Sequence, residues 1–120
     1  MPVIKVWCLP KSTEEKLKAL FDSIIEGAVS IKDLGFKGEE DNTVLFPVDM
    51  MSYGLGIDII IEAGSQAFMR CSQATRDRFA EAMVTAVSRH FPEAKVECFA
   101  YPYYVGTTCG FAASKPKEDV

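Results

Sequence analysis

Two segments of this chain carry apolar side chains at the same helical spacing, and the second segment repeats the first 62 positions later. Their spacing, i, i+3, i+4, i+7, i+8 and i+11, places all six residues of each segment on one face of an α-helix. The chain is therefore predicted to contain two amphipathic helices that superimpose without a gap. The first stripe consists of Leu17, Leu20, Phe21, Ile24, Ile25 and Ala28, and the second of Phe79, Ala82, Met83, Ala86, Val87 and His90.

Each predicted helix is preceded and followed by a strand. Residues 3–8 and 57–62 come before the helices, and residues 43–48 and 95–101 come after them. These segments are short and rich in β-branched and aromatic residues. Two strands joined through one helix pair in parallel with a right-handed crossover. The sequence therefore predicts an α/β two-layer fold, in which duplicated β-α-β units form a four-stranded mixed sheet with two helices on one face.

The start of the first helix and the composition of the core follow from the same pattern. The run Ser12-Thr13-Glu14-Glu15 is a capping box, with Ser12 as the N-cap and Glu15 reaching back to it. Large residues of the two stripes should point at one sheet face. The expected core is Leu17, Leu20, Phe21, Ile24, Ile25, Phe79, Met83 and Val87.

The chain of 120 residues has the length of one domain. We predict a single domain over residues 1–113, built from units 2–48 and 55–104. Residues 49–56 link the two units. Residues 114–120 are polar and charged and are predicted to form a disordered tail.

Composition excludes several classes of function. The net charge of −4 and the absence of a basic cluster argue against nucleic acid or a membrane as the main partner. No segment has the length of a membrane span or a signal peptide, so a cytoplasmic location is expected. The cysteines lack C-x-x-C spacing, and we expect free thiols and no metal site. They are Cys8, Cys71, Cys98 and Cys109, of which Cys8 and Cys98 fall in predicted strands.

Both faces of the predicted strands carry large apolar residues. Helices can cover only one face of such a sheet. The other face would hold Trp7, Ile60, Phe99 and Tyr101, which is an unusually apolar surface for a monomer. This pattern favours burial of the uncovered face against other subunits.

The opening Met1-Pro2-Val3-Ile4-Lys5-Val6, the duplicated β-α-β unit and the sheet with two apolar faces resemble the tautomerase superfamily. Its members include macrophage migration inhibitory factor, 4-oxalocrotonate tautomerase and 5-carboxymethyl-2-hydroxymuconate isomerase. The resemblance covers residues 2 to about 106, and in length the chain is similar to the fused, two-unit branch, which forms trimers. It implies a tautomerase-like fold, a homotrimer, a small-molecule substrate and catalysis without a cofactor.

The resemblance also assigns residues to the site. In that family, removal of the initiator methionine exposes a proline whose secondary amine acts as general base or acid, and Pro2 is the matching position. Lys11 lies close to the position of a substrate-binding arginine, after a one-residue shift. Lys32 lies about where a pocket lysine is found, and Lys37 is its competitor because the loop is longer here.

The last predicted strand corresponds to the stretch that offers a tyrosine and an asparagine to the neighbouring pocket. This chain has Glu97 and Phe99 there, followed by Tyr101 as a wall of the pocket. A carboxylate at Glu97 would repel an anionic substrate. The departure therefore bears directly on which substrate can be bound.

Each of these residues also has a structural interpretation. Proline is well tolerated at the first position of a strand, and a lysine such as Lys5 protects an edge strand from aggregation. Lys11 and Lys32 could be solvated residues at helix ends. Glu97 is either a pocket acid or half of an ion pair with Lys5 of another subunit, and Tyr101 could serve interface packing.

The sequence and the resemblance together predict a cofactor-independent keto–enol tautomerase or isomerase of a small 2-keto or enol acid that uses Pro2. The alternative is a catalytically silent, oligomeric binding or structural protein with the same fold. A third interpretation is an unrelated ferredoxin-like regulatory domain, which is also built from β-α-β repeats.

Overall fold

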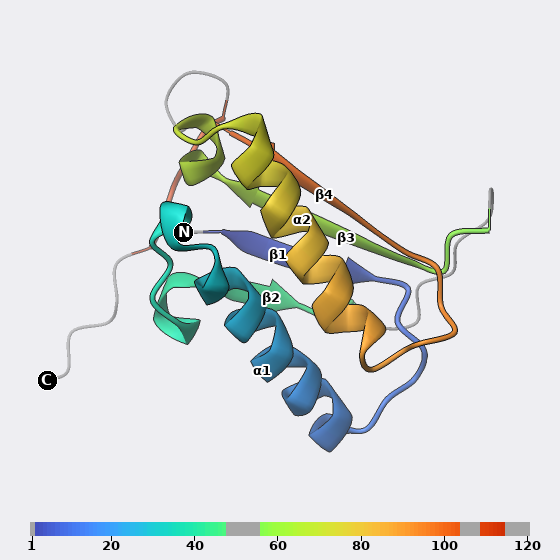
Figure 1. Cartoon of the computed structure of the whole chain (residues 1–120). Coiled ribbons are helices and arrows are strands. Elements are labelled where there is room, and N and C mark those ends of the chain that lie inside the picture. Colours follow the sequence, from blue (N-terminus) through green and yellow to red (C-terminus); the bar gives the residue numbers. More distant parts are fainter. Residues whose placement is uncertain (1, 48–55, 104–108, 115–120) are drawn as a thin grey trace, which may run out of the picture.

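A computed structural model describes residues 2–47, 56–103 and 109–114. Two long helices lie on one face of a four-stranded sheet (Figure 1). This arrangement confirms the predicted fold class. The elements in chain order are β1 Val3–Trp7, α1 Glu14–Ser30, η1 Lys32–Leu34, η2 Glu39–Asp41, β2 Thr43–Leu45, β3 Ile59–Ser65, η3 Gln66–Met69, α2 Gln73–Ser88 and β4 Val96–Pro102.

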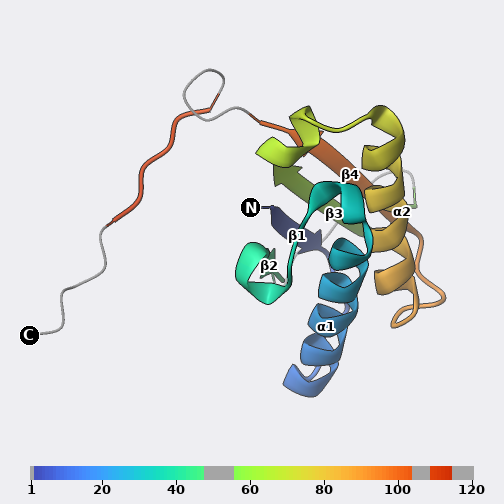
Figure 2. The ribbon, with the colours of Figure 1, turned by 60° about the vertical axis from the view of Figure 1, so that its left-hand side comes forward.

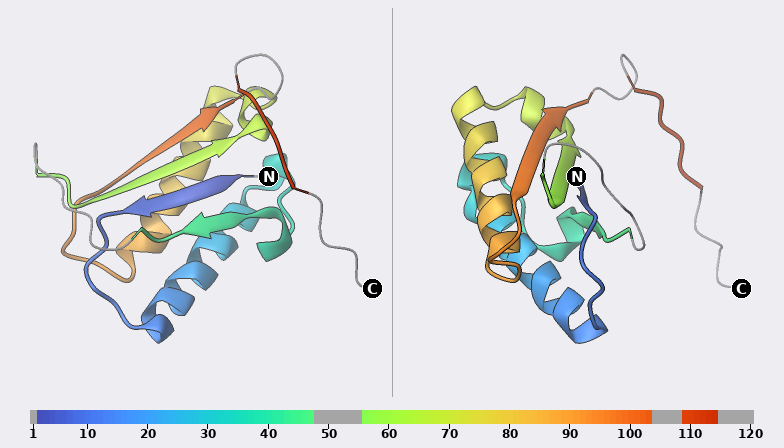
Figure 3. Two further views of the ribbon diagram at one scale, coloured as in Figure 1. Left: turned by 180° about the vertical axis from the view of Figure 1, so that it is seen from behind. Right: turned by 90° about the vertical axis from the view of Figure 1, so that its right-hand side faces the viewer.

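The sheet has the strand order β2-β1-β3-β4. The outer pairs, β1 with β2 and β3 with β4, are parallel, as expected for two β-α-β units. The central pair, β1 with β3, is antiparallel, and Ile4 lies opposite Ala63 in it. The two units therefore run in opposite directions, and the beginning of β1 lies at the same edge of the sheet as the end of β3 (Figure 3).

Side-chain caps begin both long helices, but not at the residue the capping box suggested. The Thr13 hydroxyl accepts a hydrogen bond from the Lys16 backbone N–H at 3.2 Å. Ser12, the predicted cap, instead donates to the Pro10 carbonyl. At α2 the Ser72 hydroxyl accepts from the Thr75 N–H at 3.1 Å. Both hydroxyl residues preceding α1 can cap a helix, and the structure has Thr13 in that role.

The structure places the correspondence between the two units at 59 residues, not at 62. The N-caps Thr13 and Ser72 are 59 apart, and so are three pairs of fully buried residues. A helix turns by 100° per residue, so a shift of three residues changes the direction of a side chain by only about 60°. The apolar period alone could not separate the two alignments. The buried pairs are Leu20 with Phe79, Ile24 with Met83, and Ala28 with Val87.

The strands differ from their predicted bounds in ways that pairing explains. β1 ends at Trp7 because Cys8 has a left-handed backbone with φ of 67°, so the prediction of Cys8 in a strand was wrong. β3 continues past the predicted residue 62 through Ala63, Gly64 and Ser65. These residues have weak strand propensity, but β4 pairs with all three of them and β1 pairs with Ala63 and Gly64.

The core lies between the helices and the sheet, and five of the eight expected residues are fully buried in it. The other three, Leu17, Phe21 and Ile25, are only half-buried, because they lie toward the edge of the apolar stripe on α1. Phe36 and Phe68 were not anticipated, since neither belongs to a periodic segment. They join Phe79 in edge-to-face contacts with ring centroids 5.0–6.5 Å apart.

Neither α1 nor α2 covers the opposite face of the sheet (Figure 2). Side chains alternate along the strands, and those directed away from the helices include Trp7, Ile60, Phe99 and Tyr101. Phe99 and Tyr101 are 55% and 40% exposed, and Leu45 on β2 is 44% exposed. The structure thus leaves large apolar residues uncovered on this face, which we refer to below as the open face.

Some predicted segments lie outside the described residues. These are residue 48 of the second strand, linker residues 49–55, and the tail except for Ser114, which is exposed. Within the described ranges, none of the helices is both long enough and apolar enough to span a membrane.

The unequal burial of the two stripes predicts unequal effects of truncation. Phe79→Ala should lower the free energy of unfolding by about 3–5 kcal/mol, because Phe79 is fully buried among aromatic rings. Phe21→Ala should lower it by only about 1–2 kcal/mol, because part of that ring already contacts water. Urea unfolding of both variants would measure the difference, and equal losses would contradict this description of the core.

Candidate functional site

Pro2 lies directly before the first residue of β1 and is buried. The side chain of Pro2 is fully buried, and its carbonyl accepts a hydrogen bond from the Thr43 N–H at 3.1 Å. Alternation along β1 directs Pro2 to the same side as Ile4 and Val6, toward the helix layer. Pro2 is thus held at the end of the sheet where β1 begins. Its backbone is hydrogen-bonded to β2, and its side chain is buried in the apolar core.

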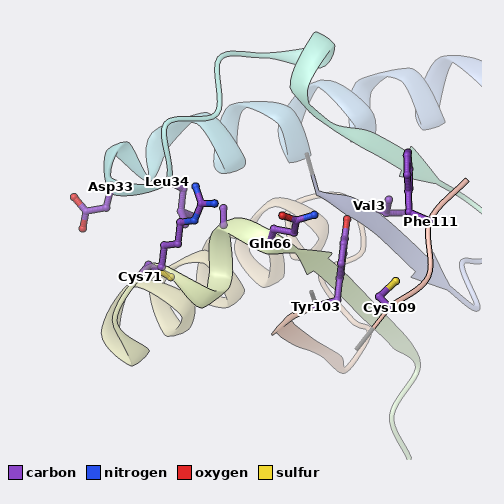
Figure 4. Close-up of a pocket in the computed structure, with 10 residues that line it drawn as sticks. Val3, Asp33, Leu34, Gln66, Cys71, Tyr103, Cys109 and Phe111 are labelled. Atoms are coloured by element: carbon purple, nitrogen blue, oxygen red, sulfur yellow. The ribbon is translucent and has the colours of Figure 1, made fainter. Parts of the chain in front are cut away.

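A pocket of about 790 Å³ opens next to this edge (Figure 4). Its walls come from the start of β1, from η1, from η3 and the turn after it, from the chain beyond β4, and from residues 109–111. Five separate parts of the sequence therefore converge at one end of the sheet. The lining residues are Val3, Asp33, Leu34, Gln66, Ala67, Arg70, Cys71, Tyr103, Cys109 and Phe111.

The charged groups of the pocket leave an excess of positive charge. Asp33 is paired, since its carboxylate lies 2.6 Å from the Arg78 guanidinium and accepts a hydrogen bond from the buried Thr75 hydroxyl. Among the described residues, the Arg70 side chain has no ion-pair partner. A small anion can therefore bind in this pocket without displacing an existing ion pair.

The Tyr103 ring lines the pocket, whereas Tyr101, expected as a wall of the pocket, does not line it in a single chain and lies on the open face. A Cβ atom built at Gly64 would lie 3.1 Å from the Tyr101 ring and 3.3 Å from the Tyr103 ring. Glycine at position 64 therefore lets both rings lie against β3. Burial, and then the neighbouring Glu62 and Tyr103, raise the pKa of Tyr101. Figure 4 shows Gln66 and Tyr103 projecting into the pocket, and the Gln66 amide offers a polar group to a bound molecule.

The predicted lysines occupy different ends of the molecule. Lys32 is exposed in η1, next to the pocket residues Asp33 and Leu34. Lys37 is also exposed, and its backbone N–H donates to the Asp41 carboxylate at 2.7 Å. Lys11 follows β1 and therefore lies at the opposite end of this strand from Pro2. Within one chain, the structure brings Lys32 near the site and leaves Lys11 far from it.

The predicted residues of β4 lie on the open face. Glu97 is exposed and pairs in register with Ile60, while Phe99 pairs in register with Glu62. Within the same chain Lys5 lies opposite Glu62 across β1 and β3, and the pair of Glu97 with Lys5 of another subunit stays a prediction. In a single chain Glu97 and Phe99 do not line the pocket, and only a neighbouring subunit could bring them to one.

Sequence reasoning missed Arg70, although a signal for it was present. At the structural repeat of 59 residues, Arg70 corresponds to Lys11, and each lies two residues before an N-cap. Lys11 follows the end of β1 and Arg70 follows the end of β3. Because these strands are antiparallel, the two cations lie at opposite ends of the sheet, measured along the strands. Arg70 is at the edge that holds Pro2.

Other polar and thiol groups of the described chain are less suited to chemistry. Burial raises the pKa of the Cys98 thiol to about 12, which keeps it protonated near neutral pH. The His90 ring is engaged by the Ser23 hydroxyl at 2.9 Å, at the other end of α2 from Arg70. In the parts of the chain that the structure describes, no group of three His, Cys, Asp or Glu residues could hold a metal ion.

The sequence matches no family model and no curated protein. Solved structures share its fold across most of the chain. A malonate semialdehyde decarboxylase is 15% identical, with a TM-score of 0.61, and the match covers 94% of this chain and 92% of that one. MIF2 of Leishmania major is 14% identical, with a TM-score of 0.66 and coverage of 92% and 93%. A wild-type fused 4-OT, described as an asymmetric trimer, is 13% identical, with a TM-score of 0.63 and coverage of 87% and 92%.

Proposed function

We propose that this chain, which has the fold of the tautomerase superfamily, is a cofactor-independent keto–enol tautomerase or isomerase of a small 2-keto or enol acid. The observation that carries the proposal is the position of Pro2. It is buried at the edge of β1, directly before Val3 in the wall of a pocket whose cation Arg70 has no ion-pair partner among the described residues.

The proposed base is the secondary amine of Pro2, exposed by removal of the initiator methionine. A keto–enol shift needs one group that takes a proton from carbon or oxygen and returns it, with a pKa near the working pH. An α-amino group titrates at about 7.7–8.0 in water. Transfer to an apolar site disfavours the charged form and lowers that value. The buried position of Pro2 supports this role.

Arg70 is proposed to bind the substrate carboxylate. A guanidinium can hold a carboxylate through two parallel hydrogen bonds, which fixes its orientation. Gln66 carries a hydrogen-bond donor that could stabilise the oxygen of a developing enolate. Lys32 could add positive charge at the same edge. The similar malonate semialdehyde decarboxylase is described as having decarboxylase and hydratase activities. Its structure was also determined with the proline at its first residue changed to alanine, which supports the choice of Pro2 as the candidate base here.

The open face supports assembly into a homotrimer. A surface that holds Phe99, Tyr101 and Leu45 at 40–55% exposure is stabilised when another subunit covers it. The fused 4-OT structure with a similar fold is described as a trimer. In such an assembly a neighbour could present Lys11, Lys37, Glu97, Phe99 or Tyr101 to the pocket beside Pro2.

A second candidate function is that of a catalytically silent oligomeric binding protein. Glu97 favours it, because an exposed carboxylate on the edge strand would oppose an anionic substrate if a neighbour brought it to the pocket. The two candidates differ in one respect that can be measured. Only the enzyme requires a free amine at Pro2.

Changes at Pro2 should separate the two candidates. With an enolisable 2-keto acid as substrate, Pro2→Ala should lower turnover by about 10²–10⁴-fold, because a primary amine is a poorer replacement for the positioned secondary amine. A residue added before Pro2 should abolish turnover, because an amide nitrogen has no basicity. Intact mass would establish the N-terminus of each preparation, and unchanged circular dichroism would establish the fold. Turnover that survives the added residue would rule out Pro2 as the base.

Arg70→Ala should raise the KM for the 2-keto acid at least about tenfold with a smaller change in kcat, because the arginine is proposed to bind the carboxylate. Lys11→Ala removes the equivalent cation of the other unit and provides the matched control. Within one chain its effect should be small. A KM increase for Lys11→Ala equal to that of Arg70→Ala would instead assign carboxylate binding to a lysine supplied by a neighbour.

Static light scattering at micromolar concentration should give about three times the chain mass of 13.3 kDa. Phe99→Glu should reduce that mass, because a carboxylate would then be buried in the interface. Val29→Glu places the same charge at a partly exposed apolar residue of α1 and should leave the mass unchanged. A monomer in the unmodified protein would overturn the proposed assembly.

A further inference from the structure

Asn42 holds a buried polar atom for which the described chain supplies no partner. The residue is only 6% exposed, and its side-chain Nδ2 donates to the Gly38 carbonyl at 2.7 Å. The side-chain oxygen, Oδ1, is buried and has no hydrogen-bond partner among the described residues. A buried polar atom without a partner destabilises the folded state, so such atoms are rare and call for an explanation.

The position of Asn42 relates this atom to Pro2. The parallel register pairs Val3 with Thr43 and Ile4 with Val44. Asn42 has an extended backbone, with φ of −128° and ψ of 134°, so the same register continues to Pro2 beside Asn42. The Thr43 N–H donates to the Pro2 carbonyl at 3.1 Å, which fixes the two chain segments to each other. Adjacent strands lie about 4.8 Å apart.

The two side chains also share one side of the sheet. Pro2 alternates with Val3 and therefore faces the helix layer together with Ile4. Asn42 alternates with Thr43 and faces the same layer together with Val44, which packs against the core. Both side chains are buried. The unpartnered oxygen and the proline ring are thus neighbours in one apolar environment.

We infer that Asn42 is a positioning residue for Pro2, whose N-terminal amine donates a hydrogen bond to Asn42 Oδ1. The inference rests on the proposed function, which requires that Pro2 be the first residue. While another residue precedes it, the proline nitrogen carries no hydrogen and cannot donate. After removal of that residue, the neutral amine has one N–H and the ammonium has two. The unpartnered acceptor then has a donor.

This hydrogen bond sets the acid–base balance of the amine. Desolvation lowers the pKa of a buried amine, whereas a hydrogen-bond acceptor for the charged form raises it. Asn42 therefore opposes the effect of burial while adding no charge of its own. Charged and titratable groups on the surrounding elements act on the same amine and are identical in every variant considered below. They are Lys32 and Asp33 on η1, Glu39 and Asp41 on η2, Arg70 and Cys71 after η3, Tyr103 beyond β4, and Cys109.

The competing explanation is that Asn42 serves only to hold η2 through its bond to the Gly38 carbonyl. Two substitutions separate the explanations, because both remove that bond and differ in what they leave beside Pro2. Asn42→Leu has a similar size and no acceptor. Asn42→Asp keeps an acceptor and gives it a negative charge.

The experiment follows the ¹⁵N chemical shift of Pro2 against pH in ¹⁵N-proline-labelled protein. Methionine aminopeptidase treatment and intact mass would ensure that every sample begins at Pro2. We expect Asn42→Leu to lower the pKa of the Pro2 amine by about one unit, and Asn42→Asp to raise it by at least as much. Shifts in opposite directions cannot come from loss of the Gly38 bond, which the two variants share.

An unchanged pKa in Asn42→Leu, or shifts of the same direction in both variants, would overturn the inference. If Asn42→Leu does not fold, Asn42→Ala removes the acceptor with less change of shape, and the same comparison applies. The measurement does not use turnover. Opposite shifts without any activity toward 2-keto acids would therefore reject the proposed function and leave Asn42 as the partner of the amine.

Discussion

The antiparallel pairing of β1 with β3 is the contact on which the rest of the structure depends. Each β-α-β unit supplies one parallel pair, and only this central ladder, with Ile4 opposite Ala63, joins the units into one sheet. It places both helices on the same face, where they pack against each other as well as against the strands. Gly27 permits that approach, since a Cβ there would lie 3.2 Å from Met83 and 3.3 Å from the Ala82 carbonyl.

The same ladder assembles the site. Because β1 and β3 run in opposite directions, the start of one strand and the end of the other meet at one edge of the sheet. Pro2 comes from that start, and Arg70 follows shortly after that end. The two units therefore have similar folds and differ in the residues at corresponding ends, since Pro2 and Arg70 lie at one end of the sheet and Lys11 lies at the other.

The two faces of the sheet have different energetic roles. The face toward the helices stabilises the chain through buried residues such as Ile4 and Ile61, which need no partner molecule. The open face presents Phe99 and Tyr101, whose burial would stabilise an assembly. The pocket lies at the end of the sheet where β1 begins. The buried Pro2 and the unpartnered oxygen of Asn42 lie at the same end. Among the described residues, the other buried polar side-chain atom without a partner, Trp7 Nε1, lies at the opposite end of β1.

The sequence by itself determined the elements and the face that each helix buries. Residues 17–28 and 79–90 have an apolar period that only an amphipathic helix satisfies, and each helix joins two strands that pair in parallel. The alternation of large apolar residues in the strands likewise determined that the sheet has an uncovered apolar face. The resemblance to a known family, drawn from the opening residues and this layout, added Pro2 as the candidate base.

Tertiary structure alone decided which residues surround Pro2. The repeat of 59 rather than 62 residues follows from the caps at Thr13 and Ser72, because a shift of three residues hardly changes which face of a helix is apolar. Phe36, Phe68 and Arg70 lie in short or irregular segments, where no periodicity marks a residue as buried or functional. The register of β1 with β2 places Asn42 beside Pro2. It depends on backbone hydrogen bonds between segments 40 residues apart, and such pairing cannot be predicted from the local sequence.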